Sequence, residues 1–191
     1  QVEIEYFIAL CNSSITNLNQ FPKNKFDDLR AIYKNFTLEN AERVKEIEFE
    51  INHDVKAVEY FIKEKFDQLK LTEFKEFIHF GLTSQDINNT AVPYSIKEAM
   101  EKTYIPSLIN IQSLLKKKTE EWEDVPLLSR THGQAASPTR MGKEINVFLE
   151  RINEQIQLLK SIPFRAKFGG ATGNFNAHHV AFPNINWKEF A

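Results

Sequence analysis

Three of the five histidines lie where a helical pattern is interrupted or has just ended, so they are candidates for chemistry. They are His53 in Asn52-His53-Asp54, His79 just before Gly81 and Thr83-Ser84, and His132 in Ser129-Arg130-Thr131-His132-Gly133-Gln134. An imidazole changes charge close to neutral pH, which suits general acid or base work. A lone histidine is more often a surface or core residue than a catalyst, so only the three together point to a site.

A helix start beside these histidines has the groups that bind small anions. Thr83 and Ser84 offer hydroxyls, free backbone N–H groups and the positive end of a helix dipole, and Arg130 offers charge. With His132 to transfer a proton, such a set could bind a small polyanion and act on it. The same hydroxyls could be helix caps only, since residues 83–86 fit the capping-box pattern. Residue types alone therefore predict a helical protein with an anion pocket.

Spacing disfavours other chemistries. A histidine metal site is the weaker alternative because no pair lies four residues apart on one helix, and Cys11 is the single cysteine. The run Gly169-Gly170-Ala171-Thr172-Gly173 lacks the lysine and the preceding strand of a phosphate loop, so it predicts a tight, mobile turn. No Ser-His-Asp or Cys-His arrangement indicates a nucleophile. We expect no metal and no cofactor.

Composition restricts the class of partner. The 191 residues carry a formal charge of −2 from 24 basic and 26 acidic residues, so no basic excess favours nucleic acid or an anionic membrane. No apolar run reaches the roughly 18 residues of a membrane span, and no signal peptide is visible. With 42% hydrophobic residues, the chain fits one or two globular units. We expect a cytoplasmic protein with neither nucleic-acid nor membrane partners.

The elements that must position these residues are helices. Apolar residues recurring every three or four positions predict helices over 2–19, 24–36, 39–66, 72–79, 84–123 and 138–161. Thr37 is expected to cap the third helix, which breaks at 50–52, where Asn52 could be a second N-cap with Asp54 in the first turn. Pro93 and Pro106 predict kinks or breaks in the long fifth helix.

The rest of the chain predicts connections. Residues 124–136 have no periodicity and are expected to form a loop, with Ser137-Pro138 starting the following helix. No segment has a defensible strand period, so the expected fold is all-α, with long helices that need partners. The chain starts at Gln1 and stops just after residues 187–190 begin a helical pattern. We interpret it as a piece of a longer polypeptide.

Four segments along residues 52–178 resemble signature regions of the adenylosuccinate lyase family, within the fumarase/aspartase superfamily. They are Asn52–Tyr60, Phe77–Asn89, Leu127–Thr139 and Gly170–His178. The Asn-His-Asp and Gly-Asn-Phe-Asn-Ala-His sequences favour the adenylosuccinate branch of the long bacterial type. The resemblance implies an N-terminal helical domain over 1–79 and the first part of a long-helix bundle domain over 80–191.

The resemblance also implies an activity, a carbon-nitrogen lyase of purine biosynthesis. Such an enzyme releases fumarate by β-elimination from adenylosuccinate, giving AMP, and from succinyl-aminoimidazole carboxamide ribotide. It needs a base, donors for the carbanion and an acid for the leaving nitrogen, and no cofactor. The implied partner is a small nucleotide substrate, and the implied assembly of the full-length protein is a homotetramer.

The resemblance assigns roles to residues of this chain. His132 is the implied general acid, and Thr83 and Ser84 are implied to hold a carboxylate of the succinyl group. Arg130 is expected to be structural or field-setting, and His79 mainly structural. The implied substrate-binding residues are Asn52, His53, Asp54, Thr83 and Ser84.

Two family features are absent from these residues. The family's catalytic serine lies on a loop beyond residue 191, and its phosphate-binding Arg-Tyr pair lies before Gln1. Because the family's site is built from three subunits, we expect this piece alone to be inactive. The alternatives are another superfamily enzyme, such as argininosuccinate lyase or a cycloisomerase, and a non-catalytic helical scaffold that retains the loops.

Overall fold

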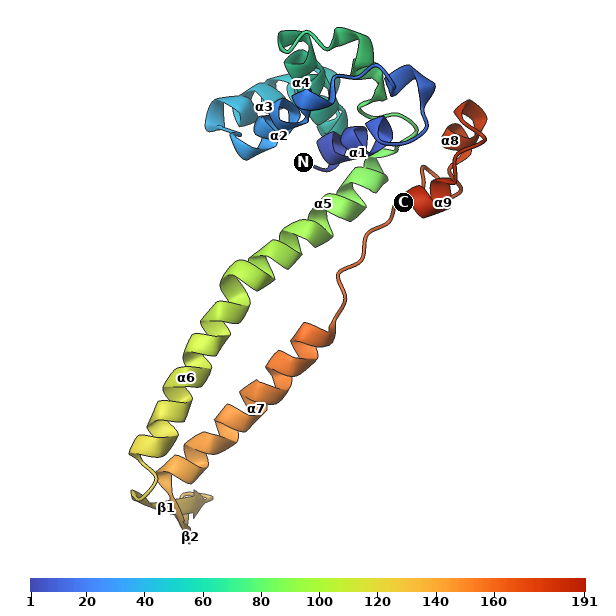
Figure 1. Cartoon of the computed structure of the whole chain (residues 1–191). Coiled ribbons are helices and arrows are strands. Elements are labelled where there is room, and N and C mark those ends of the chain that lie inside the picture. The colour runs from blue at the N-terminus through green and yellow to red at the C-terminus, as the bar shows by residue number, and fades with distance from the viewer. The chain divides into compact units, whose positions relative to one another are not determined.

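The computed structural model describes all 191 residues, and they fall into two compact units. Unit 1 comprises Gln1–Val92 and Ala166–Ala191, and unit 2 comprises Pro93–Arg165. Helices dominate each unit, and the one sheet has two strands, which confirms the all-α expectation (Figure 1). The units differ in extent from the domains predicted over 1–79 and 80–191, and that division stays a prediction.

Unit 1 consists of short helices around an apolar core. They are α1 (Val2–Cys11), α2 (Phe26–Lys34), α3 (Leu38–Ile51), α4 (Asp54–Gln68), the start of α5 (Ser84–Ala99), α8 (Asn176–Ala181) and α9 (Trp187–Phe190), with 3₁₀ turns at Thr16–Leu18, Lys23–Lys25 and Thr72–Phe77. The predicted helices at 2–19 and 24–36 are therefore shorter than expected, and the one at 72–79 is a 3₁₀ turn. A helix at residues 187–190 is confirmed.

The predicted break after α3 is present, but its capping differs. Thr37 caps α3 as expected, accepting a hydrogen bond from the Asn40 N–H at 3.4 Å. Asn52 has left-handed backbone angles, φ 54° and ψ 37°, and ends α3, so its predicted role as an N-cap is wrong. Asparagine tolerates this conformation better than other residues with a side chain. The N-cap of α4 is His53.

Aromatic packing holds the core of unit 1 together. Phe7 is fully buried on α1, with its ring edge-on to Phe21 and Phe66 at centroid distances of 5.1 and 4.9 Å. Such edge-to-face pairs stabilise beyond their burial by about 0.5–1.5 kcal/mol each. The core extends through α4 to the turn before Gly81, and so it supports the backbone that precedes α5.

The last segment of the chain packs into this core through His178. Its ring is fully buried and lies 4.7 Å from the Trp187 ring. The Tyr6 hydroxyl donates to the Phe80 carbonyl at 2.5 Å, so its oxygen accepts from His178 Nε2 at 3.0 Å. A Cβ at Gly81, whose φ is 67°, would lie 2.6 Å from the imidazole. Glycine at position 81 therefore meets both a backbone and a packing requirement.

Unit 2 is a helix pair joined by a β-hairpin. It contains the end of α5, a π-helical turn (Met100–Tyr104), α6 (Ile105–Glu121), β1 (Pro126–Thr131), β2 (Gln134–Arg140) and α7 (Met141–Ser161). Helices α6 and α7 lie side by side (Figure 1). Their close approach depends on Gly142, where a Cβ would lie 2.4 Å from the Thr119 carbonyl oxygen.

The hairpin corrects the loop predicted at 124–136. Its two-residue turn is His132-Gly133, with φ of 50° and 79°, and Thr131 pairs with Gln134 across it. Two positive φ values are the requirement of a type I′ turn, whose twist matches that of paired strands. The predicted helix start at Ser137-Pro138 is also wrong, because Pro138 pairs with Leu128 in the sheet and α7 begins at Met141.

The two prolines of the long helical segment have different effects. Helix α5 continues through Pro93, so the predicted break is absent there. Before Pro106 the helix widens into the π-helical turn, and the Ile105 N–H bonds the carbonyl of Met100. Because proline lacks an N–H and crowds the preceding turn, a local change of helix type beside it is expected. No helix of this structure is both long and apolar enough to cross a membrane.

Candidate functional site

The turn between α3 and α4 positions the first candidate histidine. His53 Nδ1 accepts a hydrogen bond from the Lys56 N–H at 3.2 Å and so caps α4. An accepting Nδ1 in a neutral ring leaves the proton on Nε2. Asp54 lies in the first turn, where its carboxylate accepts from the Val55 N–H at 2.7 Å. The sharp turn at Asn52 thus leaves the Nε2–H of His53 free to bind outside its own helix.

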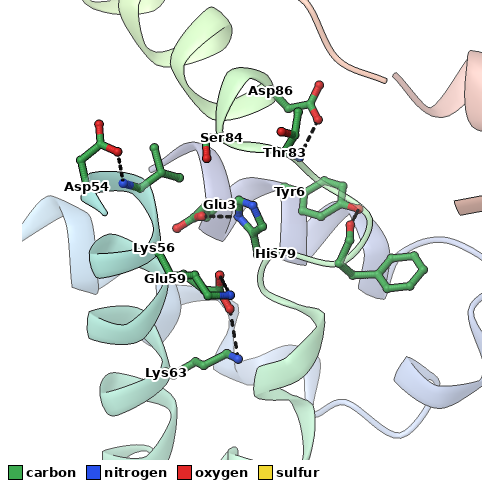
Figure 2. A network of polar contacts seen from close by, with 12 residues as sticks. Glu3, Tyr6, Asp54, Lys56, Glu59, Lys63, His79, Thr83, Ser84 and Asp86 are labelled. Atoms are coloured by element: carbon green, nitrogen blue, oxygen red, sulfur yellow. Dashed lines mark hydrogen bonds and ion pairs between the residues drawn. The ribbon is translucent and has the colours of Figure 1, made fainter. Parts of the chain in front are cut away.

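The start of α5 positions Thr83 and Ser84. The Thr83 N–H donates to Asp86 Oδ2 at 2.9 Å, and the Asp86 N–H donates to the Thr83 carbonyl at 2.9 Å. An acid that reaches back to the start of its own helix is the arrangement of a capping box. The acid half of the capping box expected at residues 83–86 is therefore present, whereas the Asp86 N–H bonds the Thr83 carbonyl and not its hydroxyl. The bond from the Thr83 N–H to Asp86 fixes the backbone that carries both hydroxyls (Figure 2).

These two helix starts meet. His53 Nε2 lies 3.3 Å from Ser84 Oγ, although the two residues are 31 positions apart in the chain. Both groups are partly open to solvent: the His53 side chain is 48% exposed, and Ser84 is partly buried. Two helix N-termini and two polar donors converge here, which favours an anion over a cation as ligand. Of the predicted site residues, the structure brings together Asn52, His53, Asp54, Thr83 and Ser84.

His132 belongs to unit 2, at the tip of the hairpin. Its backbone is left-handed and its side chain is exposed. Arg130 lies on the neighbouring strand β1, and Arg140 at the end of β2 pairs with Asp124 at 2.9 Å. An exposed imidazole at a tight turn can give or take a proton. The hairpin thus presents the predicted general acid without enclosing it.

His79 contacts the core of unit 1. Its Nδ1 lies 2.7 Å from Glu3 Oε1, and the Glu3 side chain is 2% exposed (Figure 2). Burial raises the pKa of the Glu3 carboxyl, although the bond to His79 opposes the shift. A histidine engaged with an enclosed acid beneath the site agrees with the mainly structural role expected for it.

Sequence reasoning gave Asp86 only a capping role and missed its contacts with Lys167 and the glycine run. Asp86 is fully buried, and its carboxylate accepts from Lys167 Nζ at 2.8 Å and from the N–H groups of Gly169 and Gly170. The glycine run does form the predicted turn, with the Gly173 N–H donating to the Gly170 carbonyl at 3.3 Å, but Asp86 holds its start in place. Apart from the capping pattern at Asp86, the only local signal was a lysine two residues before the glycine run.

Two buried carboxylates of unit 1 stay ionised. Burial disfavours the charged form of Asp86, but the bonds from Lys167, Thr83 and Gly169 outweigh it, so its pKa lies below the ordinary value. Burial likewise opposes ionisation of Glu59, and ion pairs with Lys56 and Lys63, at 2.8 and 3.1 Å, lower its pKa. No group of three or more histidine, cysteine, aspartate or glutamate side chains suits a metal ion.

Comparison with known proteins decides the family. A family model described as a lyase matches residues 3–191. The chain belongs to this lyase family. An adenylosuccinate lyase from Dictyostelium discoideum is 53% identical to it over 199 residues, and one from Vibrio cholerae is 43% identical over 192. Both alignments cover 100% of this chain and 42% of the relative, so the chain spans less than half the length of these lyases.

Solved structures of lyases share the fold. The class II fumarase of Schistosoma mansoni superposes with a TM-score of 0.73 at 19% identity, over 92% of this chain and 40% of the fumarase. At that identity the likeness concerns the fold alone. The expected helical architecture of the fumarase/aspartase type is confirmed, as is the resemblance of the sequence to adenylosuccinate lyases.

Proposed function

We propose that the full-length protein containing this chain is an adenylosuccinate lyase. It releases fumarate by β-elimination from adenylosuccinate, giving AMP, and from succinyl-aminoimidazole carboxamide ribotide. Relatives with that name align with the whole chain, which supports the substrate class. The observation that carries the proposal is the meeting of His53 and Ser84 at two helix starts, because it creates a site suited to a carboxylate.

The binding half of the reaction is assigned to unit 1. Thr83 and Ser84 hold a carboxylate of the succinyl group with their hydroxyls and the start of α5. His53 supports the same group through its Nε2–H, which lies within reach of Ser84. Asn52 and Asp54 line the substrate site on the same turn. Donors aimed at a carboxylate also stabilise the charge that develops when the neighbouring carbon loses its proton.

The chemical half is assigned to His132 and to a base outside these residues. The base removes a proton from the carbon beside the carboxylate, and that electron pair forms the double bond of fumarate. The C–N bond breaks, and His132 as imidazolium gives its proton to the leaving nitrogen. The atoms and charges balance with no metal and no organic cofactor.

The proposal extends to the assembly. The full-length protein is a homotetramer of the cytoplasm, acting on a nucleotide. The 191 residues alone are inactive, because the base is assigned to residues outside them and the family's site is built from three subunits. Turnover of adenylosuccinate by the purified 191-residue chain, above a reaction without protein, would contradict this part.

A fumarate-release assay of the full-length protein tests the function. Adenylosuccinate and argininosuccinate are offered side by side, with His132→Ala as the matched variant. We expect turnover of adenylosuccinate only, and a loss of about 10²–10⁴-fold in the variant, which is the usual contribution of a general acid. Turnover of argininosuccinate alone would show that argininosuccinate, and not adenylosuccinate, is the substrate. No turnover of either compound by folded protein would favour a non-catalytic scaffold.

A further inference from the structure

Asp86 is an enclosed charged group beside the carboxylate site, and the proposed reaction does not use it. Its side chain is fully buried, two residues after Ser84 on α5. Ionised carboxylates are almost never fully buried without partners, because desolvation of the charge is costly. The contacts of the Asp86 carboxylate explain why a charged group is buried at this position.

Four donors converge on the carboxylate of Asp86. Oδ1 accepts from Lys167 Nζ at 2.8 Å and from the Gly169 N–H at 3.0 Å. Oδ2 accepts from the Thr83 N–H at 2.9 Å and from the Gly170 N–H at 3.0 Å. Both oxygens are therefore engaged within the protein, and the group serves to join segments rather than to bind substrate.

The segments it joins are the start of α5 and the glycine run more than 80 residues later. Successive N–H groups that point at one anion require unusual backbone angles, and Gly170 has a φ of 77°. Space is also short, since a Cβ at Gly169 would lie 3.0 Å from the Gly173 backbone. The glycines thus form a cradle for the carboxylate of Asp86. Through the Thr83 N–H, that cradle restrains the backbone that carries the two hydroxyls.

The positive charge of Lys167 compensates the negative charge of Asp86. A negative charge two positions after Ser84 would repel a substrate carboxylate, and because Asp86 is fully buried, solvent does little to weaken the repulsion. The Lys167 ammonium, 2.8 Å away, makes the pair neutral. Its side chain is 38% exposed, so its charge is open to substitution without disruption of the core.

We propose that Asp86 is a positioning residue that holds Thr83 and Ser84 in place for a carboxylate of the substrate, while Lys167 compensates its charge. The inference rests on the proposed function, since it assumes that these hydroxyls bind that carboxylate. If Asp86 had a purely structural role, it would stabilise the fold without affecting substrate binding. Experiments can separate the two roles.

Four variants of the full-length protein separate these roles. Asp86→Asn puts an NH₂ group against N–H donors, Lys167→Met removes the compensating charge, and Lys167→Arg keeps it. The matched control is Glu59→Gln, because Glu59 is also buried, is paired with two lysines and is outside the carboxylate site. Steady-state fumarate release gives KM and kcat, and the thermal midpoint gives stability.

The expected result is a split between substrate affinity and stability. Asp86→Asn raises KM about tenfold or more, since loss of one bond to a charged group is enough for that factor. Lys167→Met raises KM because the buried charge of Asp86 is then uncompensated, and Lys167→Arg, which keeps the positive charge, restores KM. Glu59→Gln lowers the thermal midpoint and leaves KM unchanged.

A second measurement does not depend on activity. Amide hydrogen exchange reports whether residues 83–86 and 169–173 stay anchored, and we expect Asp86→Asn to speed exchange in both segments together. If wild-type protein releases no fumarate, the proposed function fails, and unchanged exchange in Asp86→Asn would overturn the anchoring as well. With an active wild type, a wild-type KM in both Asp86→Asn and Lys167→Met would overturn the inference. Should Asp86→Asn not fold, the two Lys167 variants decide.

Discussion

Unit 1 and unit 2 bury their apolar side chains to very different extents. The core of unit 1 runs from α1 through α4 to Trp187, whereas Leu149 and Ile156 are the only buried hydrophobic side chains of unit 2. Unit 2 leaves large apolar residues exposed on its helices, among them Ile109, Ile111, Leu114, Phe148 and Leu158. Burial is the main stabilising term in folding, so the two units cannot be equally self-sufficient.

The candidate site follows the same division. In unit 1 the residues of the site are held by bonds within the chain, such as those of Asp86 and the pair His53–Ser84. In unit 2 the candidate acid His132 is exposed on a hairpin. A site that must position a carboxylate benefits from rigid support. Under the proposed function, unit 1 is therefore the preformed binding half, and the full-length protein supplies the surroundings that His132 needs for proton transfer.

The largest expected difference concerns large-to-small substitutions. In the 191-residue chain, Phe7→Ala is expected to destabilise unit 1 by about 3–5 kcal/mol, the usual cost of deleting a buried aromatic ring. Phe148→Ala, whose ring is 54% exposed, is expected to change stability by less than about 0.5 kcal/mol. Urea unfolding followed by tryptophan fluorescence measures both changes in stability. In a Trp122→Phe background, Trp187 reports on unit 1, and in a Trp187→Phe background, Trp122 reports on unit 2. Equal losses of stability in Phe7→Ala and Phe148→Ala would contradict the difference in burial between the two units.

Two glycines with positive φ are expected to differ less in the stability cost of substitution by alanine. Gly81 has a φ of 67° and its Cβ position is 2.6 Å from the His178 ring, whereas Gly133 has a φ of 79° and nothing within 4 Å. Gly81→Ala combines backbone strain with overpacking, for about 3 kcal/mol, while Gly133→Ala has the strain alone, about 1 kcal/mol. The thermal midpoints of the two full-length variants rank them. A larger loss from Gly133→Ala would contradict the account.

The pH dependence of stability is expected to separate two carboxylates. The pKa values of Asp86 and Glu144 are both lowered, the first by bonds that outweigh burial and the second by the Thr139 hydroxyl and Lys143. A lowered pKa contributes stability above the unfolded value, about 3.9 for aspartate, and the contribution is lost as pH falls through the folded value.

Asp86→Asn should therefore lose stability at neutral pH and converge with wild type in acid. The Glu144 side chain is 37% exposed and its ion pair with Lys143 is screened by solvent, so Glu144→Gln should stay close to the wild-type curve throughout. Thermal midpoints from pH 7 to pH 3 test both expectations. A gap between Asp86→Asn and wild type that widens in acid would show that Asp86 is protonated in the folded protein.

Local patterns predicted the features that depend on neighbouring residues. Apolar spacing predicted most helices, and Thr37 was recognised as a cap because a capping hydroxyl acts within one helical turn. The hairpin was missed because Pro126–Thr131 has no strand alternation and His-Gly is a weaker turn signal than Asn-Gly. The pair Asp86–Lys167 was missed because its partners are 81 positions apart, and no periodicity reports such a contact.

The division of labour between the two units is tested most directly by the kinetics of Ser84→Ala and His132→Ala in the full-length protein. With adenylosuccinate as substrate, we expect Ser84→Ala to act mainly on KM, because it removes a binding contact of unit 1. His132→Ala should lower kcat by about 10²–10⁴-fold with little change in KM, because it removes a proton transfer. A wild-type kcat in His132→Ala, or a loss confined to kcat in Ser84→Ala, would contradict the account.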